Sequence, residues 1–306
     1  MFKFPRLFLA LGVSVVALPL LGAPMAGASS VPAQCVVSLS PTASETLFAI
    51  GAGPQVQAVD SDSDFPTSGL PAKRINALNP SVEAVIGICK TSASHPSTKP
   101  DLVIISYDAN QIKEKLTGLG VKVVEQDAPS NLAGAYAEIT QLGALTGHVR
   151  RADDLVASLK QTVKADVASM PAHPKKRVTI YYELDPTYYS LTSDTFVGSL
   201  LKDLGALNVA DAESTSADAG YPQLSAEYIA SANPKLILLA DTVCCKMTPA
   251  KVAKRAGFAK VNAVVNGHVV NLNDDVASRW GPRLGILMNE LTKAVKGVLK
   301  DPKAWK

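Results

Sequence analysis

The stretch HVRRADDLVASLKQTVKADVASM, which spans His148–Met170, has the pattern of one long helix. It contains no Gly or Pro, and an apolar residue recurs at every fourth position from Leu155 to Val167, which is the spacing of one helix face. At 1.5 Å per residue, its roughly 22 residues would extend about 33 Å, enough to run from one lobe of a protein to another. Gly147 before it and Pro171 after it are suitable boundaries. We therefore predict a stiff connecting helix over residues 148–170.

Strand-length apolar runs and helical patterns alternate on both sides of this helix. Such alternation is typical of βαβ units and of a mainly parallel sheet. We predict an α/β protein with two Rossmann-like lobes, mainly parallel sheets and a ligand cleft between the lobes, joined by the one long rigid helix. The predicted segments are a signal peptide (1–28), an N-terminal lobe (29–147), the interlobe helix (148–170) and a C-terminal lobe (171–306). The supporting runs are strands at 36–39, 102–105, 121–124, 178–181, 236–239 and 269–272, and helices at 45–50, 111–119, 197–204 and 285–299.

The two lobes contain a related segment, which is the most informative internal feature of the sequence. Leu78–Ile86 leads to Pro100–Ile104 in the first lobe, as Leu224–Ile229 leads to Pro234–Leu238 in the second. Each copy has Ser-x-Glu, a short helical pattern, Pro and a buried strand, and the first copy is longer by about ten residues. Self-similarity of this kind indicates duplicated halves. Because Ser-x-Glu is also a common capping pattern, a chance origin is the alternative.

The first 28 residues have the three zones of a secretory signal. Lys3 and Arg6 precede an apolar run from about Leu7 to Leu21, and small residues follow. The run is shorter than the roughly 20 residues of a spanning helix and is broken by Pro19 and Pro24, so a cleaved signal is favoured over a membrane span. We therefore predict an exported protein, periplasmic or at the cell surface. No lipobox precedes Cys35, so a lipid anchor on it is not expected.

Composition and motifs exclude several function classes. The formal net charge of +3 would fall to about +1 after loss of Lys3 and Arg6, so we expect no nucleic-acid-binding surface. The sequence has no Gly-x-Ser-x-Gly, His-Glu-x-x-His or Gly-Lys-Ser/Thr motif, so we predict that the protein is not an enzyme. Its four histidines lack the paired spacing of a zinc site, so neither a metal site nor a resident cofactor is expected. We expect a monomer.

Cys35, Cys89, Cys244 and Cys245 are more typical of disulfides than of free thiols in an oxidising compartment. Four cysteines allow three pairings. The favoured scheme joins Cys35 to Cys89 within the first lobe and closes a small, strained ring between Cys244 and Cys245. Cross-lobe pairing is one alternative, and a thiolate metal or redox site at the adjacent pair is another.

The turn after the first predicted strand is a candidate ligand site. In a parallel sheet this turn lies at the carboxyl edge, where ligands usually bind, and free backbone N–H groups there can meet ligand oxygens. We therefore include Ser40, Pro41 and Thr42 among the candidate binding residues, with an ordinary helix cap as the alternative. Either Ser40 with Pro41, or Thr42 with Glu45, can cap the following helix. The glycines at 51–53 follow that helix, so they indicate a helix stop instead of a phosphate loop.

Tyrosines are concentrated where turns of the second lobe should line a cleft. Their amphipathic rings suit a large ligand with apolar faces and a polar rim. Simple core packing is the alternative, above all for Tyr181, which falls within a predicted strand. The candidates are Tyr182, Tyr188 and Tyr221 from the second lobe, with Phe65 and Tyr107 from the first.

The segment between the last strand and the C-terminal helix, residues 274–283, combines charge, an aromatic ring and a fixed turn. Asp275 has the chemistry to accept hydrogen bonds from ligand amides, and Arg279 to donate a fork of them to amide or phosphate oxygens. Trp280 adds a ring beside them. We interpret the segment as a ligand contact, with a solvated loop as the alternative.

Glu83 and Glu227 each fall in the first turn of a predicted helix, where the helix dipole favours a carboxylate. Helix stabilisation alone would account for both. Their equivalent places in the two copies suggest a further role, in which one acid on each lobe meets a basic site on a symmetric membrane partner.

With these features together, the chain resembles the helical-backbone class (class III) of ABC-transporter periplasmic binding proteins. This class includes receptors for cobalamin (vitamin B12), ferric siderophores and haem. The resemblance covers nearly all of the sequence after the signal peptide. Its marks are Val37–Glu45, Pro100–Ile104, the helix at 148–170 and Ala263–Val269.

Within this class the chain is most similar to cobalamin-binding members, whose Asp-x-x-x-Arg-x-x-Pro-Arg pattern matches residues 275–283. The resemblance implies that Asp275 and Arg279 contact the amide side chains of a corrin. It implies that Glu83 and Glu227 engage arginines of an ABC permease dimer, to which an unaltered corrinoid is delivered. The family's cleft aromatics fall near the tyrosines named above, where the family more often has tryptophan, so another flat or chelated ligand could fit.

Three other functions stay open. The first is a haem or ferric-siderophore receptor of the same class, in which His95 or a cleft tyrosine would be the axial ligand of haem. The second, from a different class, is a secreted thiol oxidoreductase that uses Cys244 and Cys245. The third is an exported sensor or scaffold with a vestigial cleft.

Overall fold

The structure is a computed structural model that describes residues 31–93, 95–171 and 176–306. The predicted signal peptide, residues 1–28, lies outside the described residues. Residues Pro32–Lys306 form one compact unit. Within the described part of the chain, no helix combines the length and the apolar character that crossing a membrane requires.

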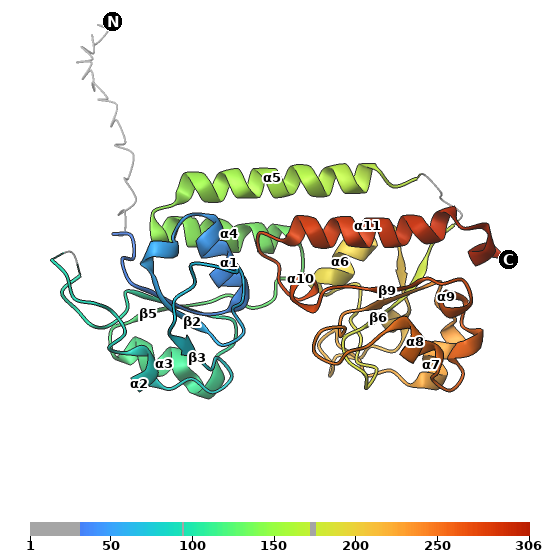
Figure 1. Cartoon of the computed structure of the whole chain (residues 1–306), viewed down its shortest axis with the longest axis horizontal. Helices are drawn as coiled ribbons and strands as arrows, with labels where there is room; N and C mark the ends of the chain where they lie inside the picture. Colours follow the sequence, from blue (N-terminus) through green and yellow to red (C-terminus); the bar gives the residue numbers. More distant parts are fainter. Residues whose placement is uncertain (1–30, 94, 172–175) are drawn as a thin grey trace, which may run out of the picture. The chain divides into compact units, whose positions relative to one another are not determined.

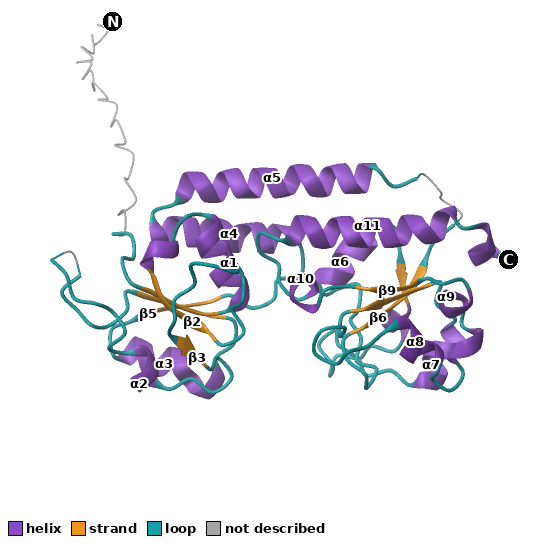
Figure 2. Cartoon of the chain, in the orientation of Figure 1, coloured by secondary structure: helices purple, strands orange, loops and turns teal. Residues whose placement is uncertain are grey.

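The N-terminal lobe is built on a five-stranded parallel sheet with the order β3-β2-β1-β4-β5 (Figure 2). All four residues of β1 and all four of β4 are buried, as expected for a parallel sheet that is covered on both faces. The strands are β1 (Val36–Leu39), β2 (Val56–Asp60), β3 (Arg74–Ile75), β4 (Leu102–Ile105) and β5 (Lys122–Glu125), and the helices are α1 (Pro41–Ala49), α2 (Val82–Val85), α3 (Ile112–Gly118) and α4 (Leu132–Thr146).

The C-terminal lobe contains a four-stranded parallel sheet with the order β7-β6-β8-β9. Tyr182, which we expected in a turn, lies inside β6. The strands are β6 (Thr179–Glu183), β7 (Leu207–Asn208), β8 (Leu236–Leu239) and β9 (Val269–Asn271), and the helices are α6 (Phe196–Asp203), α7 (Ala226–Ala232), α8 (Pro249–Ala253), α9 (Asn262–Val265), α10 (Asp274–Ala277) and α11 (Leu284–Lys300).

The two sheets repeat one topology, which agrees with a duplicated sequence. The order β2-β1-β4-β5 of the first lobe corresponds to β7-β6-β8-β9 of the second, and the first lobe adds β3 at its edge. The related segments occupy equivalent places: Ser81 caps α2 before β4, and Ser225 caps α7 before β8. In each case the serine hydroxyl accepts a backbone N–H bond from the residue three positions later. The Ser-x-Glu pattern is therefore both a helix cap and part of the repeat.

The long helix predicted at 148–170 is confirmed as α5 (Val149–Ala168), which lies alongside α4 and α11 (Figure 1). Its buried face, with Val156, Leu159 and Val163, belongs to a core cluster that also contains residues of both sheets. Gly143 of α4 permits close approach, because a Cβ atom there would lie 2.4 Å from the Cβ atom of Ala152. The helix therefore packs on helices of both lobes. The predicted segment limits 29–147, 148–170 and 171–306 stay predictions.

The start and end of α1 settle which capping scheme the sequence uses. Ser40 is the N-cap and accepts from the Ala43 backbone N–H, with Pro41 in the first turn. The alternative capping box of Thr42 with Glu45 is wrong, because the Glu45 carboxylate bonds to two arginines instead. The predicted helix stop is confirmed by Gly51, whose φ of 87° lies in the left-handed region that favours glycine.

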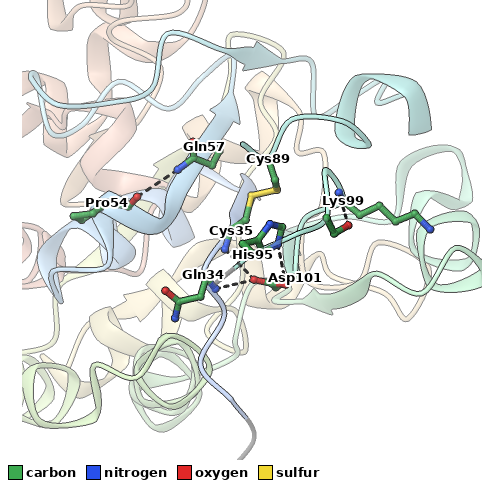
Figure 3. Close-up of a disulfide and its surroundings, with 9 residues drawn as sticks. Gln34, Cys35, Pro54, Gln57, Cys89, His95, Lys99 and Asp101 are labelled. Atoms are coloured by element: carbon green, nitrogen blue, oxygen red, sulfur yellow. Dashed lines mark hydrogen bonds and ion pairs between the residues drawn. A yellow bond between two sulfur atoms is a disulfide. The ribbon is translucent and has the colours of Figure 1, made fainter. Parts of the chain in front are cut away.

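A disulfide between Cys35 and Cys89 confirms the predicted pairing in the first lobe (Figure 3). It joins the residue before β1 to the insertion between α2 and β4. Asp101, just before β4, accepts from the backbone N–H groups of Gln34 and Cys35 and contacts His95 Nε2 at 3.1 Å. The insertion is therefore fixed to the amino edge of the sheet, the edge opposite to that at which parallel-sheet proteins bind ligands.

The predicted bond between Cys244 and Cys245 is not formed in this structure. Both cysteines are free, and their Sγ atoms lie 2.7 Å apart.

Candidate functional site

A pocket of about 170 Å³ lies at the carboxyl end of β6, the edge at which α/β sheets bind ligands. The start of α6 and the end of α10 form its walls, and Ala128, which follows β5, contributes from the first lobe. Its surface is aromatic and aliphatic, and no residue of the lining is charged. The lining consists of Ala128, Tyr182, Leu184, Leu191, Thr195, Phe196, Val197, Tyr221, Ala277, Ser278 and Trp280.

Tyr182 supplies a polar atom in this apolar surface. Its side chain is fully buried, and its hydroxyl has no hydrogen-bond partner within the described residues. Burial, and then the nearby carboxylates of Asp274 and Asp241, raise the pKa of Tyr182 well above its ordinary value. The hydroxyl therefore stays protonated, and it could donate to a ligand acceptor once the side chains that cover it move apart. Tyr221, also predicted as a ligand contact, lines the same pocket.

Trp280 lines the pocket and connects the two lobes. Its ring meets Phe196 edge-on at a centroid distance of 6.4 Å, and its Nε1 atom donates to Glu138 Oε2 of α4 at 2.6 Å. Burial, with a smaller contribution from Asp127, raises the pKa of Glu138 to about 7, although the bond from Trp280 opposes this rise. The indole is therefore held in place by a carboxyl group of the other lobe.

Beside the pocket, five charged side chains form what we call the interlobe ion cluster: Glu45, Asp64, Asp275, Arg279 and Arg283. Arg279 is only 7% exposed and bonds to carboxylates of both lobes. Its Nη1 atom donates to Glu45 at 2.8 Å and to Asp64 at 2.6 Å, and its Nη2 atom donates to Asp275 at 2.6 Å. Arg279 and Asp275 were both predicted as ligand contacts. In this structure the guanidinium group of Arg279 donates to protein carboxylates, and Asp275 is one of them.

Arg283 completes the interlobe ion cluster. It donates to both oxygens of Glu45, at 2.9 and 2.6 Å, and its guanidinium group lies 4.6 Å from the centre of the Phe65 ring. Three carboxylates surround two guanidinium groups, so the fully ionised cluster has an excess of one negative charge. Phe65, predicted as a cleft aromatic, therefore packs against an arginine at this junction.

The residues at the start of α1 are buried beneath the second lobe. Ser40 is 1% exposed and Thr42 is 8% exposed. A Cβ atom at Gly281 would lie 3.1 Å from Thr46 Oγ1 and 3.3 Å from the Thr42 carbonyl oxygen, so Gly281 packs closely against α1. Pro41 is half-buried. Thr42 is thus part of the contact between the lobes, and none of these three predicted binding residues lines the pocket.

Two other predicted contacts lie apart from the pocket. Tyr107 is 68% exposed after β4. Tyr188 packs on the opposite face of the second sheet from Tyr182, stacked on Phe258 at 6.4 Å with the Arg255 guanidinium group 5.0 Å from its centroid. Neither residue belongs to the lining.

A buried acidic pair on that same face was not anticipated from the sequence. Glu183, at the end of β6, forms a bidentate ion pair with Arg255 at 2.5 and 2.7 Å. Asp241 is fully buried, and neither of its carboxylate oxygens has a hydrogen-bond partner in the described chain. Burial and then the charge of Glu183 raise the pKa of Asp241 to about 7. The available indication was an acid two residues after each of the predicted strand runs 178–181 and 236–239.

The predicted docking acids are exposed, one on each lobe. Glu83 lies in the first turn of α2, and Glu227 in the first turn of α7. Their placement agrees with the first-turn prediction. Their partner stays a prediction.

Comparison with known proteins identifies the family. Residues 36–276 match the family described as "Periplasmic binding protein". An uncharacterized ABC transporter substrate-binding lipoprotein of Bacillus subtilis, YvrC, is 30% identical over 269 residues, which cover 85% of this chain and 79% of that protein. A cobalamin-binding protein of Halobacterium salinarum is 27% identical over 257 residues, which cover 81% of this chain and 66% of that protein.

The structural likeness extends to proteins with other ligands in their names. The apo form of the periplasmic haem-binding protein RhuT from Roseiflexus sp. RS-1 has a TM-score of 0.72 at 21% identity, with coverage of 87% of this chain and 99% of that chain. At this identity the likeness shows the fold alone. The chain therefore belongs to the periplasmic binding protein family, in the class with two parallel-sheet lobes and a connecting helix, and is a substrate-binding protein of the ABC-transporter type.

Proposed function

We propose that this substrate-binding protein is exported, binds a corrinoid of the cobalamin type and delivers it unaltered to an ABC permease dimer. The observation that carries the proposal is the charge state of the pocket. Its lining is uncharged, and the arginines of the adjoining interlobe ion cluster are paired with carboxylates. A ligand that carries several anionic groups would find no unpaired cation in this lining.

A neutral ligand rimmed with amides suits this surface better than an anionic one. Cyanocobalamin has no net charge, and the rim of its flat ring carries amide groups. Tyr182 would donate to an amide carbonyl, while Trp280 and Phe196 would pack on apolar faces. The excess negative charge of the interlobe ion cluster opposes haem propionates and acidic iron chelates. A curated relative named as a cobalamin-binding protein gives independent support.

The pocket is smaller than the roughly 300–1,000 Å³ of ordinary small-molecule sites. At about 170 Å³ it would hold one edge of a corrinoid. The remainder would extend past Tyr221, which is 39% exposed, towards exposed aromatic side chains such as Tyr107. Binding then requires a modest separation of the lobes. The long α5 and the interlobe ion cluster should keep this motion small.

A haem receptor is the second candidate, because Tyr221 lines the pocket and tyrosine is a known axial ligand of haem. Two features weigh against it. Burial raises the pKa of Tyr221, which disfavours the phenolate form that binds iron. His95 is bonded to Asp101 at the amino edge of the first sheet, away from the pocket, so the histidine considered for this role is badly placed.

The thiol oxidoreductase alternative has weaker support. Catalytic cysteines have lowered pKa values, because the thiolate is the nucleophile. Burial, and then the neighbouring Cys245 and Asp274, raise the pKa of Cys244 to about 12. A thiol in this state is a poor nucleophile near neutral pH.

The test of ligand identity is titration of the purified protein with cyanocobalamin, haem and a ferric siderophore, by calorimetry and absorbance. We expect cyanocobalamin to bind in one-to-one stoichiometry with a Kd of about 1 μM or below, and the two anionic ligands at least tenfold more weakly. If haem bound more tightly than cyanocobalamin and its Soret band shifted, the ligand would be haem and not a corrinoid. The Tyr221→Phe variant would then lose that shift.

The delivery step is tested separately by charge reversal on the two lobes. Glu83→Lys with Glu227→Lys should abolish cobalamin uptake by cells while ligand affinity in vitro stays unchanged, because both acids are exposed and distant from the lining. Glu213→Lys is the matched control, since Glu213 is also an exposed glutamate of the second lobe. Normal uptake by the double variant contradicts the docking role.

A further inference from the structure

Two free thiols lie next to each other in the turn after β8. Cys244 is exposed and Cys245 is half-buried, with Sγ atoms 2.7 Å apart. Cys245 packs against the core cluster that contains Phe258. Small reagents can therefore reach the pair at Cys244, while the fold holds the second sulfur in contact with the first.

The distance between the sulfur atoms distinguishes two kinds of chemistry. A disulfide bond is about 2.05 Å long, so bond formation needs an approach of about 0.7 Å. A shared zinc-like ion would hold each thiolate at about 2.3 Å, and a tetrahedral angle would place the two sulfur atoms about 3.8 Å apart. The observed separation is closer to the bond. We propose that Cys244 and Cys245 are a reversible dithiol–disulfide site whose oxidation weakens ligand binding in the adjoining pocket.

Asp274 connects this site to the pocket. Its carboxylate accepts from the backbone N–H of Thr242 at 2.8 Å, of Val243 at 3.0 Å and of Cys244 at 2.7 Å. The same residue begins α10, whose last residue, Ala277, lines the pocket. Ring closure must turn the peptide between Cys244 and Cys245, whose N–H group donates to the Asp241 carbonyl oxygen at 3.2 Å. The accompanying rotation about the Cys244 Cα atom disturbs the neighbouring bond from the Cys244 N–H to Asp274. The effect on ligand binding rests on the function proposed above.

The oxidation is a thiol–disulfide exchange with a small-molecule disulfide. The thiolate of one cysteine attacks a sulfur of that molecule, its S–S bond breaks and one small thiolate leaves. The second cysteine then attacks the protein-bound sulfur, which forms the Sγ–Sγ bond and releases the second small thiol. The pair loses two electrons and two protons, and the external disulfide is reduced to two thiols.

The surroundings of Cys244 slow the oxidation of the dithiol. Although Cys244 is exposed, partial desolvation of its sulfur atom, followed by the contacts with Cys245 and Asp274, raises the pKa of Cys244 to about 12. Little thiolate therefore forms near neutral pH. The exchange is therefore slow at neutral pH and accelerates as pH rises. This behaviour differs from that of a catalytic dithiol and fits a site that responds to sustained oxidising conditions.

The chemical half of the proposal is tested by mass spectrometry on the full chain with oxidised glutathione at about pH 8. The treated protein should be about 2 Da lighter, without a retained glutathione adduct, and peptide mapping should place the new bond between Cys244 and Cys245. The Cys245→Ser variant should retain glutathione on Cys244, because no neighbouring thiol displaces it. A stable adduct on the native chain, disulfide-linked dimers or unreacted thiols would overturn the proposal.

The coupling to the pocket is tested with two readouts. Cyanocobalamin should bind the oxidised protein at least about fivefold more weakly than the reduced protein, the lower end of ordinary coupling between sites. The double variant Cys244→Ser/Cys245→Ser should bind equally well with or without glutathione. Equal affinities of the two native states would overturn the coupling.

A second readout needs no ligand, so failure of the proposed function can be distinguished from failure of this inference. Trp280 lines the pocket just after α10, and Trp305 is the other tryptophan of the chain. In a Trp305→Phe background, oxidation should shift the emission of Trp280, and the shift should disappear in the double serine variant. Unchanged emission on confirmed ring closure would overturn the coupling. If the reduced protein did not bind cyanocobalamin but the Trp280 emission still shifted on oxidation, the result would contradict the proposed corrinoid ligand and leave the redox coupling intact.

Discussion

The two lobes share one sheet order, but they differ at the carboxyl ends of their strands. In the first lobe, polar side chains there bond to one another: Ser63 donates to Ser44 at 2.8 Å, and Ser44 donates to Ser38 at 2.9 Å. In the second lobe, Tyr182 and Asp241 are buried at corresponding ends, without hydrogen-bond partners in the parts of the chain that are described. Unsatisfied buried polar groups are costly. The two lobes therefore share a scaffold, while the buried polar groups at the strand ends of the second lobe lack the hydrogen-bond partners that those of the first lobe have.

The cysteines repeat this contrast. In the first lobe, the Cys35–Cys89 bond fixes the insertion at the amino edge of the sheet. In the second, Cys244 and Cys245 stay free near the carboxyl edge, five and six residues after the end of β8 at Leu239. One lobe therefore uses its sulfur atoms for stability. The other has sulfur atoms that can still react.

The strongest expected effect comes from breaking the interlobe ion cluster. Arg279→Ala should lower the free energy of unfolding by about 3–5 kcal/mol, because Glu45, which is 1% exposed, loses one of its two arginine partners in a buried site. Urea unfolding followed by circular dichroism measures the change. Arg150→Ala is the control, since its contact with Asp154 is 3.9 Å long and highly exposed. A loss below about 1 kcal/mol for Arg279→Ala would show that the two lobes do not depend on this contact.

The next effect tests the sulfur contrast. Replacing Cys35 and Cys89 by Ser should lower the free energy of unfolding by about 2–4 kcal/mol, because the disulfide constrains a chain separation of 54 residues in the unfolded state. The same denaturant titration with and without reductant measures it. The Cys244→Ser/Cys245→Ser variant should change stability by much less, since no bond is lost. If both double variants lost the same free energy of unfolding, the cysteines of the two lobes would not differ in their contribution to stability.

The fold was largely predictable because its strands are continuous buried runs. β1, β4 and β8 were predicted to the residue, since all four positions of each are apolar or small and must be buried on both faces. β2 was missed because Gln57 and Asp60 interrupt its apolar run. β3 and β7 have two residues each, which is too short for any periodicity.

The site was predicted less well because charge partners are set by the folded chain. Arg279 and Glu45 are 234 positions apart, so no local sequence pattern relates them. Within the predicted binding set, the pocket brings together Tyr182, Tyr221 and Trp280 alone. A strand periodicity of two would have placed Tyr182 and Tyr181 on opposite faces, and this was the signal that could have distinguished them.

A smaller effect concerns the buried acid of the second lobe. The pKa of Asp241 is raised to about 7 in the folded protein, whereas an unfolded Asp titrates near 3.9. Between these values the folded state holds a proton that the unfolded state has lost, so stability falls as pH rises from about 4 to 7 and the loss is complete above that range. Asp241→Asn should therefore raise Tm by a few degrees at about pH 8 and have little effect near pH 4.

Thermal unfolding across that pH range measures the effect, with Asp203→Asn as an exposed control in the same lobe. A Tm gain that does not vary with pH would show that the Asp241 carboxyl is not the source. Glu138→Gln extends the comparison to the first lobe. The pKa of Glu138 is also about 7, but its carboxyl accepts from Trp280, so its variant should gain less.

The smallest effect separates the two faces of one strand. The hydroxyls of Tyr181 and Tyr182 are both buried and, within the described residues, both lack hydrogen-bond partners, but only Tyr182 lines the pocket. Each Tyr→Phe change removes an unsatisfied polar group, so both variants should be as stable as the parent or slightly more stable. Tyr182→Phe should nevertheless weaken cyanocobalamin binding about fivefold, the equivalent of roughly 1 kcal/mol for one hydrogen bond. Tyr181→Phe should leave the affinity unchanged, because its hydroxyl faces the Glu183 side of the sheet. If calorimetry found the same affinity for both variants, the Tyr182 hydroxyl would have no part in binding. Its lack of a hydrogen-bond partner would then be a feature of the fold and not of the ligand site.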